Sequence, residues 1–435
     1  MIRILKYGEA RDEEIFALSG VGAGARDRQA EDVAAAVSGI IDAVRQEGDR
    51  AVLRFEEKFD GARLPSLEVP EAELDAAMKE TPSDFLRILE RAARNIENFH
   101  SRQTRTGFAV QGEPGVILGQ RVIPMDRVGV YVPGGTAAYP STVQMNVIPA
   151  KIAGCGEVVM TTPPGRDGRV IPLILAAART AGADRVFRMG GAQAVAALAW
   201  GTESVPRVDK IVGPGNVYVA EAKRQVFGRV AIDMIAGPSE ILIVADGATN
   251  PAWAAADMLS QAEHDRNASA VLVTDSPELA EAVARELEAQ LERLSRREIA
   301  RASIEANGRI IVTKDLPQAI DIANAIAPEH LELCLEDPFA WLPSVRHAGS
   351  VFLGRHCPVA LGDYMAGPNH TLPTSGTARF SSPLSVDDFV KRSQYIYCTA
   401  EGLAAAAEDI ASFASLEGLN AHAESALIRM GKSAL

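Results

Sequence analysis

Short apolar runs of β type alternate with Ala-rich helical segments along most of this chain, and this rhythm most constrains its fold. The first set of runs lies at 128–132, 157–160, 185–187, 209–212 and 230–235. Successive runs begin about 22–29 residues apart, which leaves room for the crossover helix that two parallel strands require. This part of the chain therefore predicts a parallel sheet covered by helices.

The same rhythm resumes towards the C-terminus. The second set of runs lies at 241–245, 270–274, 309–313, 331–335 and 350–353. We therefore expect an α/β protein with two consecutive Rossmann-like parallel-sheet units.

Helical patterns flank these two units. Residues 27–103 carry apolar positions at helical spacing, and the chain reads as helical again after about Ser385. Residues 1–26, which end in the Gly-rich VGAGAR, are expected to form an arm or cap. The prediction is a helical N-terminal region and a helical C-terminal tail of about 50 residues, 385–435.

Charge and composition narrow the possible functions. The 435 residues include 44 Lys and Arg against 57 Asp and Glu, for a net charge of −13. An acidic chain is a poor binder of nucleic acid or anionic membranes. The four cysteines show no CxxC spacing, and no apolar run reaches the length of about 18 residues needed to span a membrane. We expect a cytoplasmic protein with no nucleic-acid and no membrane partner.

Gly-rich turns fall where several of the predicted strands end. They lie at 131–140, 189–194, 212–218 and 235–240. Glycine lets backbone N–H groups approach an anion at the carboxyl edge of a parallel sheet, so a dinucleotide or phosphate site is one interpretation. The other is that such turns need Gly and Pro for conformational reasons alone. No GxGxxG occurs, so a nicotinamide cofactor would not use the usual pyrophosphate turn.

One group of polar residues has the composition of a metal site. Gln261 and His264 are three residues apart and share a helical face, Asp363 lies in a Gly-rich loop, and His422 adds an imidazole. Imidazole and carboxylate are ordinary zinc ligands, whereas Gln is uncommon. Solvated or capping side chains remain the alternative.

A second polar group has the composition of a proton-transfer site. Glu329 and His330 place a carboxylate beside an imidazole, and His titrates near neutral pH. His370 lies in the same loop as Asp363 and is a further candidate for proton transfer. A merely polar loop between a helix and a strand is the alternative.

Longer segments connect these groups. The stretch IDMIAGPSEILIVADGATNPAWAAADMLSQAEH at 232–264 closely resembles the signature of the histidinol dehydrogenase family. The resemblance continues, in family order, from about residue 30 to the C-terminus. It is carried by YVPGGTAAYPSTVQMN, VGPGNVYVAEAK, APEHLEL, GDYMAGPNHTLPT and EGLNAH.

The resemblance implies roles for individual residues. It implies Gln261, His264, Asp363 and His422 as zinc ligands, with His422 supplied by the partner of a homodimer. It implies Glu329 and His330 as the catalytic pair. The implied substrate contacts are Ser239, His370 and Glu417, together with Gln261, His264, His330, Asp363 and His422, and Glu417 again comes from the partner. The implied cofactor contacts are Tyr131, Gln193 and Asn216.

The resemblance also implies a reaction and a role for each domain. Zinc and NAD would support the oxidation of L-histidinol through the aldehyde to L-histidine, with two NAD reduced. Residues 27–130 and 240–384 would form the catalytic, metal-bearing domain, 131–239 an incomplete Rossmann-like NAD-binding domain, and 385–435 the tail that reaches the partner. Three alternatives remain. One is a relative that oxidises another small alcohol, such as a sulfonated diol. The others are a metallohydrolase and a non-catalytic descendant of the enzyme.

Overall fold

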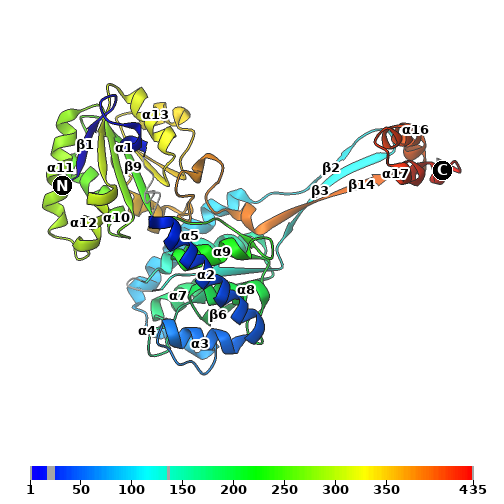
Figure 1. Cartoon of the computed structure of the whole chain (residues 1–435), viewed down its shortest axis with the longest axis horizontal. Coiled ribbons are helices and arrows are strands. Elements are labelled where there is room, and N and C mark those ends of the chain that lie inside the picture. Colours follow the sequence, from blue (N-terminus) through cyan, green and yellow to red (C-terminus); the bar gives the residue numbers. More distant parts are fainter. Residues whose placement is uncertain (1, 17–24, 135–137, 434–435) are drawn as a thin grey trace. The chain divides into compact units, whose positions relative to one another are not determined.

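The computed structural model describes residues 2–16, 25–134 and 138–433, with the side chains of 25–29 left aside. The chain forms two compact units. The first comprises residues 1–103 and 125–389, and the second comprises residues 104–124 and 390–435 (Figure 1). Most of the Gly-rich VGAGAR segment and part of the 131–140 turn lie outside the described residues.

One parallel sheet of the first unit has five strands in the order β6-β5-β4-β7-β8. The strands are β4 (Arg127–Tyr131), β5 (Glu157–Thr162), β6 (Arg185–Arg188), β7 (Lys210–Val212) and β8 (Ala231–Ile232). The chain moves outward from β4 through β5 to β6, then returns to the other side of β4 with β7. The strand order therefore reverses between β4 and β7, where open parallel sheets commonly bind ligands.

Crossover helices join these strands as the spacing predicts. They are α6 (Pro140–Ala153), α7 (Pro172–Ala181), α8 (Gly191–Trp200) and α9 (Val217–Val226). Proline opens α6 and α7, where its missing N–H costs nothing, and a glycine in the left-handed region ends each of them.

Helices from the N-terminal region also pack on this five-stranded sheet. They are α2 (Ala25–Glu47), α3 (Asp49–Phe59), α4 (Glu71–Glu80) and α5 (Ser83–His100). α2 lies against α8 and α9, α4 against α7, and α5 against α6 (Figure 1). The structure thus groups these helices with the five-stranded sheet, where the sequence analysis grouped residues 27–130 with the other one. Which part binds NAD and which part is catalytic stays a prediction.

The other parallel sheet has six strands in the order β1-β11-β10-β9-β12-β13. The strands are β1 (Arg3–Lys6), β9 (Glu240–Ala245), β10 (Ser269–Thr274), β11 (Arg309–Val312), β12 (His330–Cys334) and β13 (Ser350–Leu353). α10 (Pro251–Ala262), α11 (Pro277–Leu291) and α12 (Arg297–Asn307) share one core with it, and α1 (Asp12–Phe16) and α13 (Leu316–Ile326) share another. Helices on both faces explain why the central strands are apolar throughout.

The ten predicted strands are confirmed, and the two parallel sheets confirm the predicted α/β fold. The N-terminal residues differ from the expectation of a simple arm, because β1 adds a sixth strand beside β11. The Arg309 side chain, only 2% exposed, also donates a hydrogen bond from Nε to the carbonyl oxygen of Ile15 at 3.0 Å. Together these contacts fix the first residues to the sheet.

The second unit combines an antiparallel sheet with a helical pair. Its strands β2 (Phe108–Gln111), β3 (Val116–Pro124) and β14 (Val390–Cys398) have the order β14-β3-β2, and α16 (Ala400–Leu416) packs on α17 (Asn420–Leu427). The predicted helical tail is therefore confirmed from Ala400 onwards, whereas residues 390–398 are a strand. Residues 390–398 form a strand because their aromatic and β-branched side chains suit pairing with β3, which lies far away in sequence.

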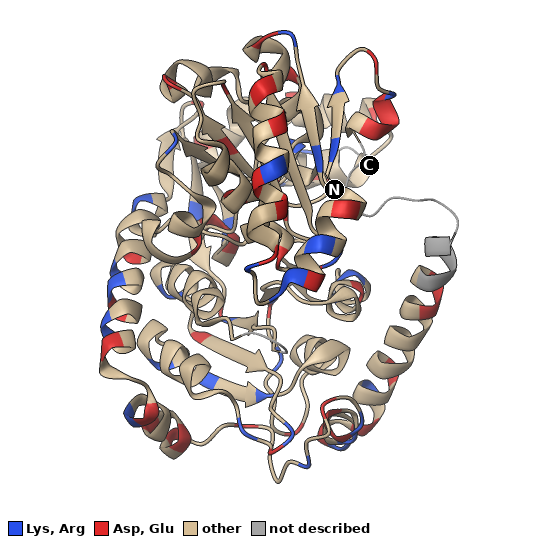
Figure 2. Ribbon diagram, turned by 90° about the vertical axis from the view of Figure 1, so that its left-hand side faces the viewer, with Lys and Arg blue, Asp and Glu red and all other residues tan. Residues whose placement is uncertain are grey.

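Several helices carry charged residues of both signs. Basic residues are interspersed with acidic ones along the helices drawn in Figure 2. Among the described residues, no helix combines the length and the apolar character needed to cross a membrane.

Candidate active site

Glu329 and His330 lie where strand β12 begins. Helix α13 ends at Ile326, the φ of 54° at Ala327 turns the chain, and Pro328 prevents the helix from continuing. His330 then pairs with Ile241 of β9 as the first residue of the strand. The predicted catalytic pair therefore stands at the amino edge of the six-stranded sheet.

The imidazole of His330 is buried and oriented. Its Nδ1 lies 2.9 Å from the carbonyl oxygen of Glu240, so the neutral ring carries its proton on Nδ1. Nε2 is buried and has no hydrogen-bond partner among the described residues. Nε2 is therefore the atom that can take up and release a proton.

Two carboxylates flank this imidazole. Glu329 Oε2 lies 3.4 Å from Nδ1, and Asp363 Oδ1 lies 3.9 Å from Nε2. Burial works against a charged ring, but these two carboxylates outweigh it and raise the pKa of His330 to about 9. Glu329 is itself held in place, because its Oε2 accepts the N–H of Glu240 at 2.8 Å.

Asp363 also links His330 to His370. It lies in a single π-helical turn, Gly362–Ala366, a conformation that is frequent at functional sites. Its Oδ1 is 3.8 Å from Nδ1 of His370, whose pKa is lowered by burial. The structure thus brings together Glu329, His330, Asp363 and His370, four of the residues predicted from the sequence.

Gln261 and His264 belong to the same edge of the sheet. Helix α10 follows β9 and runs back antiparallel to it, so its last turn returns to the amino ends of the strands. Gln261, in the last turn of α10, is only 2% exposed. His264 is exposed in the turn that follows the helix.

Ser239 directly precedes β9 and joins the two sheets. The segment from β8 to β9 leaves the carboxyl edge of the five-stranded sheet and enters the amino edge of the six-stranded one. Thr374 Oγ1 accepts the N–H of Gly237 at 2.7 Å, and Glu240 Oε1 accepts the N–H of Ser375 at 3.0 Å. The turn at 235–240 therefore serves two sheet edges, not the single carboxyl edge expected from the sequence.

Glu417 and His422 lie in the second compact unit. Glu417 follows the last residue of α16, and His422 lies in the first turn of α17. Both are exposed. Their predicted roles in the active site stay predictions.

The three predicted cofactor residues lie at the carboxyl edge of the five-stranded sheet. Tyr131 ends β4, Gln193 lies in the first turn of α8 after β6, and Asn216 caps α9 after β7. Tyr131 and Asn216 follow the two strands between which the strand order reverses. Asn216 Oδ1 accepts the N–H groups of Tyr218 and Val219, which leaves the amide nitrogen for another partner.

The turn at 189–194 differs from a phosphate-binding turn. The N–H of Gly190 donates to Glu56 Oε1 at 3.0 Å, and the N–H of Gly191 donates to Tyr131 Oη at 3.1 Å. Side chains of the protein thus already occupy donors that an anion would need. Glu56 is a residue that the sequence analysis did not single out, because it stands in an ordinary helical pattern.

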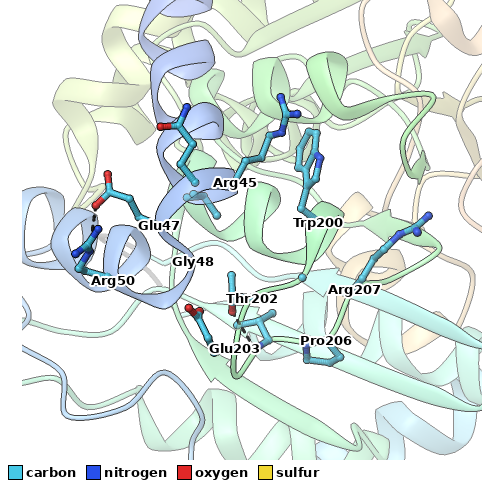
Figure 3. A pocket seen from close by; sticks show the side chains of 13 residues that line it. Arg45, Glu47, Gly48, Arg50, Trp200, Thr202, Glu203, Pro206 and Arg207 are labelled. Atoms are coloured by element: carbon cyan, nitrogen blue, oxygen red, sulfur yellow. Dashed lines mark hydrogen bonds and ion pairs between the residues drawn. The ribbon is translucent and has the colours of Figure 1, made fainter.

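A groove of about 870 Å³ lies elsewhere on the same sheet (Figure 3). It is lined by residues 44–48 and 50, where α2 ends and α3 begins, and by residues 200–203 and 205–207 at the end of α8 and after it. The guanidinium of Arg45 lies 5.3 Å from the centre of the Trp200 ring. Because helix C-termini return to the amino ends of the strands, this groove lies at the opposite edge from Tyr131, and none of the predicted site residues lines it.

Comparisons with known proteins show the family of this chain. The family model for histidinol dehydrogenase matches residues 24–430. A histidinol dehydrogenase of Syntrophotalea carbinolica is 53% identical over 435 residues, all of both chains. Another, of Geobacillus kaustophilus, is 54% identical over 397 residues, 91% of this chain and 94% of the relative.

A solved structure shows the same fold. The crystal structure of histidinol dehydrogenase from Elizabethkingia anophelis superposes with a TM-score of 0.91, at 34% identity and over 99% of each chain. With the matching family model and these full-length relatives, the chain belongs to the histidinol dehydrogenase family.

Proposed function

We propose that this protein is an NAD-dependent histidinol dehydrogenase that oxidises L-histidinol to L-histidine through the aldehyde, in the last steps of histidine biosynthesis. The observation that carries the proposal is the buried imidazole of His330. Its Nδ1 is hydrogen-bonded to the carbonyl oxygen of Glu240, and its Nε2 has no hydrogen-bond partner among the described residues. The acidic, cysteine-poor composition fits a cytoplasmic enzyme.

The first step removes a proton and a hydride from the alcohol. Nε2 of His330 takes the hydroxyl proton as the carbinol carbon loses a hydride, for which bound NAD⁺ would be the acceptor, and the carbonyl of the aldehyde forms. The hydrogen bond from Nδ1 to Glu240 keeps the ring fixed and makes Nε2 the accepting atom. A base that is held in a fixed orientation lowers the entropic cost of reaching the reactive geometry.

The second step adds water to the aldehyde and removes another hydride. Glu329 Oε2 is occupied by the N–H of Glu240, whereas Oε1 makes no hydrogen bond to a described residue. Oε1 is therefore the oxygen that orients the attacking water and accepts its proton. The proton that Nε2 of His330 took in the first step returns to the carbonyl oxygen as water adds, so the neutral ring can remove a hydroxyl proton of the hydrate as the second hydride leaves.

Gln261, His264 and Asp363 are the residues of the first unit that would hold zinc, with His422 from the partner. Gln261 fits this role because it lies buried in the last turn of α10, three residues before His264 at the same edge of the sheet. In the described part of the chain, no three His, Cys, Asp or Glu side chains gather as a metal site. Of the four proposed ligands, Gln261 is of another residue type and His422 lies in the second unit. Only His264 and Asp363 therefore belong both to those types and to this unit. Zinc would supply a template for the amino and imidazole nitrogens of the substrate.

NAD would bind along the carboxyl edge of the five-stranded sheet, where Tyr131, Gln193 and Asn216 lie. Bound NAD supplies the hydride acceptor. The turn at 235–240 runs from this edge to Ser239 and the start of β9. One short segment of chain therefore connects the edge that carries the proposed cofactor residues with the proposed substrate residue Ser239.

The second unit supports a homodimer. By the strand register, Val110, Leu118 and Ile396 share one face of its sheet, and Ile117 and Tyr397 share the other. All five are between 39% and 75% exposed, so apolar side chains stand open on both faces. Exposed apolar surface of this kind marks an interface, and a second copy would bury it while lending Glu417 and His422.

The test of the proposed function is the yield of NADH per L-histidinol consumed, with zinc present. Two NADH and one L-histidine are expected for each substrate molecule. A yield of one, with free aldehyde, would contradict the second step. No absorbance change at 340 nm would contradict the proposed dehydrogenase function as a whole.

A further inference from the structure

A buried carboxyl group without a cationic partner lies beside the proposed cofactor edge. Glu56, on helix α3, is fully buried. No Lys, Arg or His among the described residues contributes to the electrostatics of its carboxyl group. Its Oε1 instead accepts two hydrogen bonds, from the N–H of Gly190 at 3.0 Å and from Nε2 of Gln193 at 2.8 Å.

These bonds fix the turn that leads from β6 into α8. Gly190 and Gly191 stand at the start of that helix, and Gly191 has a φ of 59°, which favours glycine. The N–H of Gly191 is bound by Tyr131 Oη at 3.1 Å. On the other side, a side chain at Gly190 would come within 2.6 Å of Pro163. The turn is thus held between Glu56, Tyr131 and Pro163.

The hydrogen bond to Glu56 also sets the orientation of the Gln193 amide. With Nε2 bound to Glu56, the other end of the amide, Oε1, remains as an acceptor. That oxygen is buried and has no hydrogen-bond partner among the described residues. It is placed to accept a hydrogen bond from a donor on the cofactor, such as a hydroxyl or an amide N–H group.

Burial favours the neutral form of Glu56. Asp60, one turn later at the end of α3, also favours the neutral form, whereas the N–H groups of Gln193 and Gly190 donate to the carboxyl group and favour its charged form. Burial raises the pKa of Glu56 to about 8, and Asp60 adds to the rise. A neutral acid can still accept both hydrogen bonds through its carbonyl oxygen.

We propose that Glu56 is a positioning residue for NAD, which holds the Gly190–Gln193 turn and turns the Gln193 amide oxygen towards the cofactor. This inference rests on the proposed function, since it concerns the NAD site of that enzyme. Glu56 acts through Gln193 and Tyr131.

The test measures the Kd of NADH by fluorescence titration of the full-length, zinc-loaded protein, together with KM for NAD⁺, KM for L-histidinol and kcat. E56A removes the acceptor and should weaken NADH binding about 5- to 100-fold. KM for NAD⁺ should rise in parallel, while KM for L-histidinol and kcat at saturating NAD⁺ stay within about twofold. E56Q keeps an acceptor oxygen and should bind NADH at least about fivefold more tightly than E56A.

Two further variants complete the design. E57A changes the neighbouring exposed carboxylate of the same helix, and its NADH affinity should equal that of the wild type. E56D keeps the acid but shortens the side chain, so its NADH affinity should fall about fivefold or more even if E56A does not fold.

Unchanged NADH affinity in E56D, or in a folded E56A, would overturn the positioning role. Equal losses of affinity for NADH and L-histidinol would also overturn it, because a merely structural defect affects both sites. A wild-type protein that binds no NADH would instead contradict the proposed function itself.

Discussion

The imidazole of His330 is bound to the main chain of Glu240, the first residue of the neighbouring strand β9, at 2.9 Å from Nδ1 to the carbonyl oxygen. The same residue donates its N–H to the carboxylate of Glu329 at 2.8 Å. One peptide segment thus orients both members of the proposed catalytic pair. Their roles in the two steps nevertheless differ, and the difference can be measured.

Substitution of the pair should separate the two oxidations. H330N should slow both steps by about 10²–10⁴-fold, because each step needs a proton acceptor. E329Q should slow oxidation of the aldehyde much more than oxidation of the alcohol, because only the former needs water. Single-turnover rates with L-histidinol and with L-histidinaldehyde give the two numbers for each variant. Small and equal effects of E329Q on both substrates would contradict the assignment.

The rate should also depend on alkaline pH. His330 accepts a proton only as a neutral ring, and the flanking carboxylates raise its pKa to about 9. We therefore expect kcat/KM for L-histidinol to rise from pH 7 towards about pH 9, by about tenfold per unit where the ring is mostly protonated. The residual activity of H330N should lack this rise. A profile that is flat in the wild type across this range would rule out His330 as the base.

Removal of metal should abolish activity, and zinc should restore it. H264N should lower the zinc content measured by atomic absorption, because one of four proposed ligands is lost. H356N is the matched control, since His356 is an exposed histidine of the same unit that we assign no role. Normal oxidation of L-histidinol by metal-free protein would contradict the template role.

Mixed dimers should reveal whether two chains share each active site. H264A and H422A should each be inactive alone. If each site combines His264 of one chain with His422 of the other, a heterodimer has one site with both lesions and one intact site, and activity returns after subunit exchange. If each chain used its own His422, every site would carry one lesion. Persistent inactivity with heterodimers shown by mass spectrometry would therefore exclude shared sites.

Glu56 should lower the stability of the protein as pH rises. Its pKa is about 8 in the folded protein against an ordinary value of 4.5, so between these values the unfolded chain releases a proton that the folded chain retains. Stability falls across that window and levels off above it. E56Q removes this effect, so the difference in Tm between E56Q and the wild type should grow from about pH 5 to about pH 8. A difference that is constant with pH would contradict the raised pKa.

The parallel sheets were predictable because of where their strands lie. Strands such as β9, buried along their whole length, must be apolar throughout, and the crossover helices space them regularly. Strands β1 and β14 escaped prediction for the opposite reason. Each pairs with a strand far away in sequence, and their local composition, RILK and VKRSQYIYC, gives no crossover rhythm.

The candidate site was predictable in its residues and less so in its position. Glu329 and His330 are adjacent in sequence, and the family motifs name the remaining residues. That the site stands at the amino edge of one sheet follows only from the direction of α10 and β12. The role of Glu56 was not predicted, because a glutamate in an amphipathic helix is expected on the solvated face, where its neighbour Glu57 lies. Only tertiary packing buries Glu56.

The N-terminal strand has a consequence for handling the protein. β1 covers the free side of β11, the strand that would otherwise present unpaired main-chain groups at the border of the six-stranded sheet. An uncovered border is a template on which other molecules can add strands and aggregate. With β1 in place, the border is a four-residue strand that carries Arg3 and Lys6. A truncated protein that begins after Lys6 exposes the more apolar β11 at the border and should aggregate more readily, even though every proposed active-site residue remains.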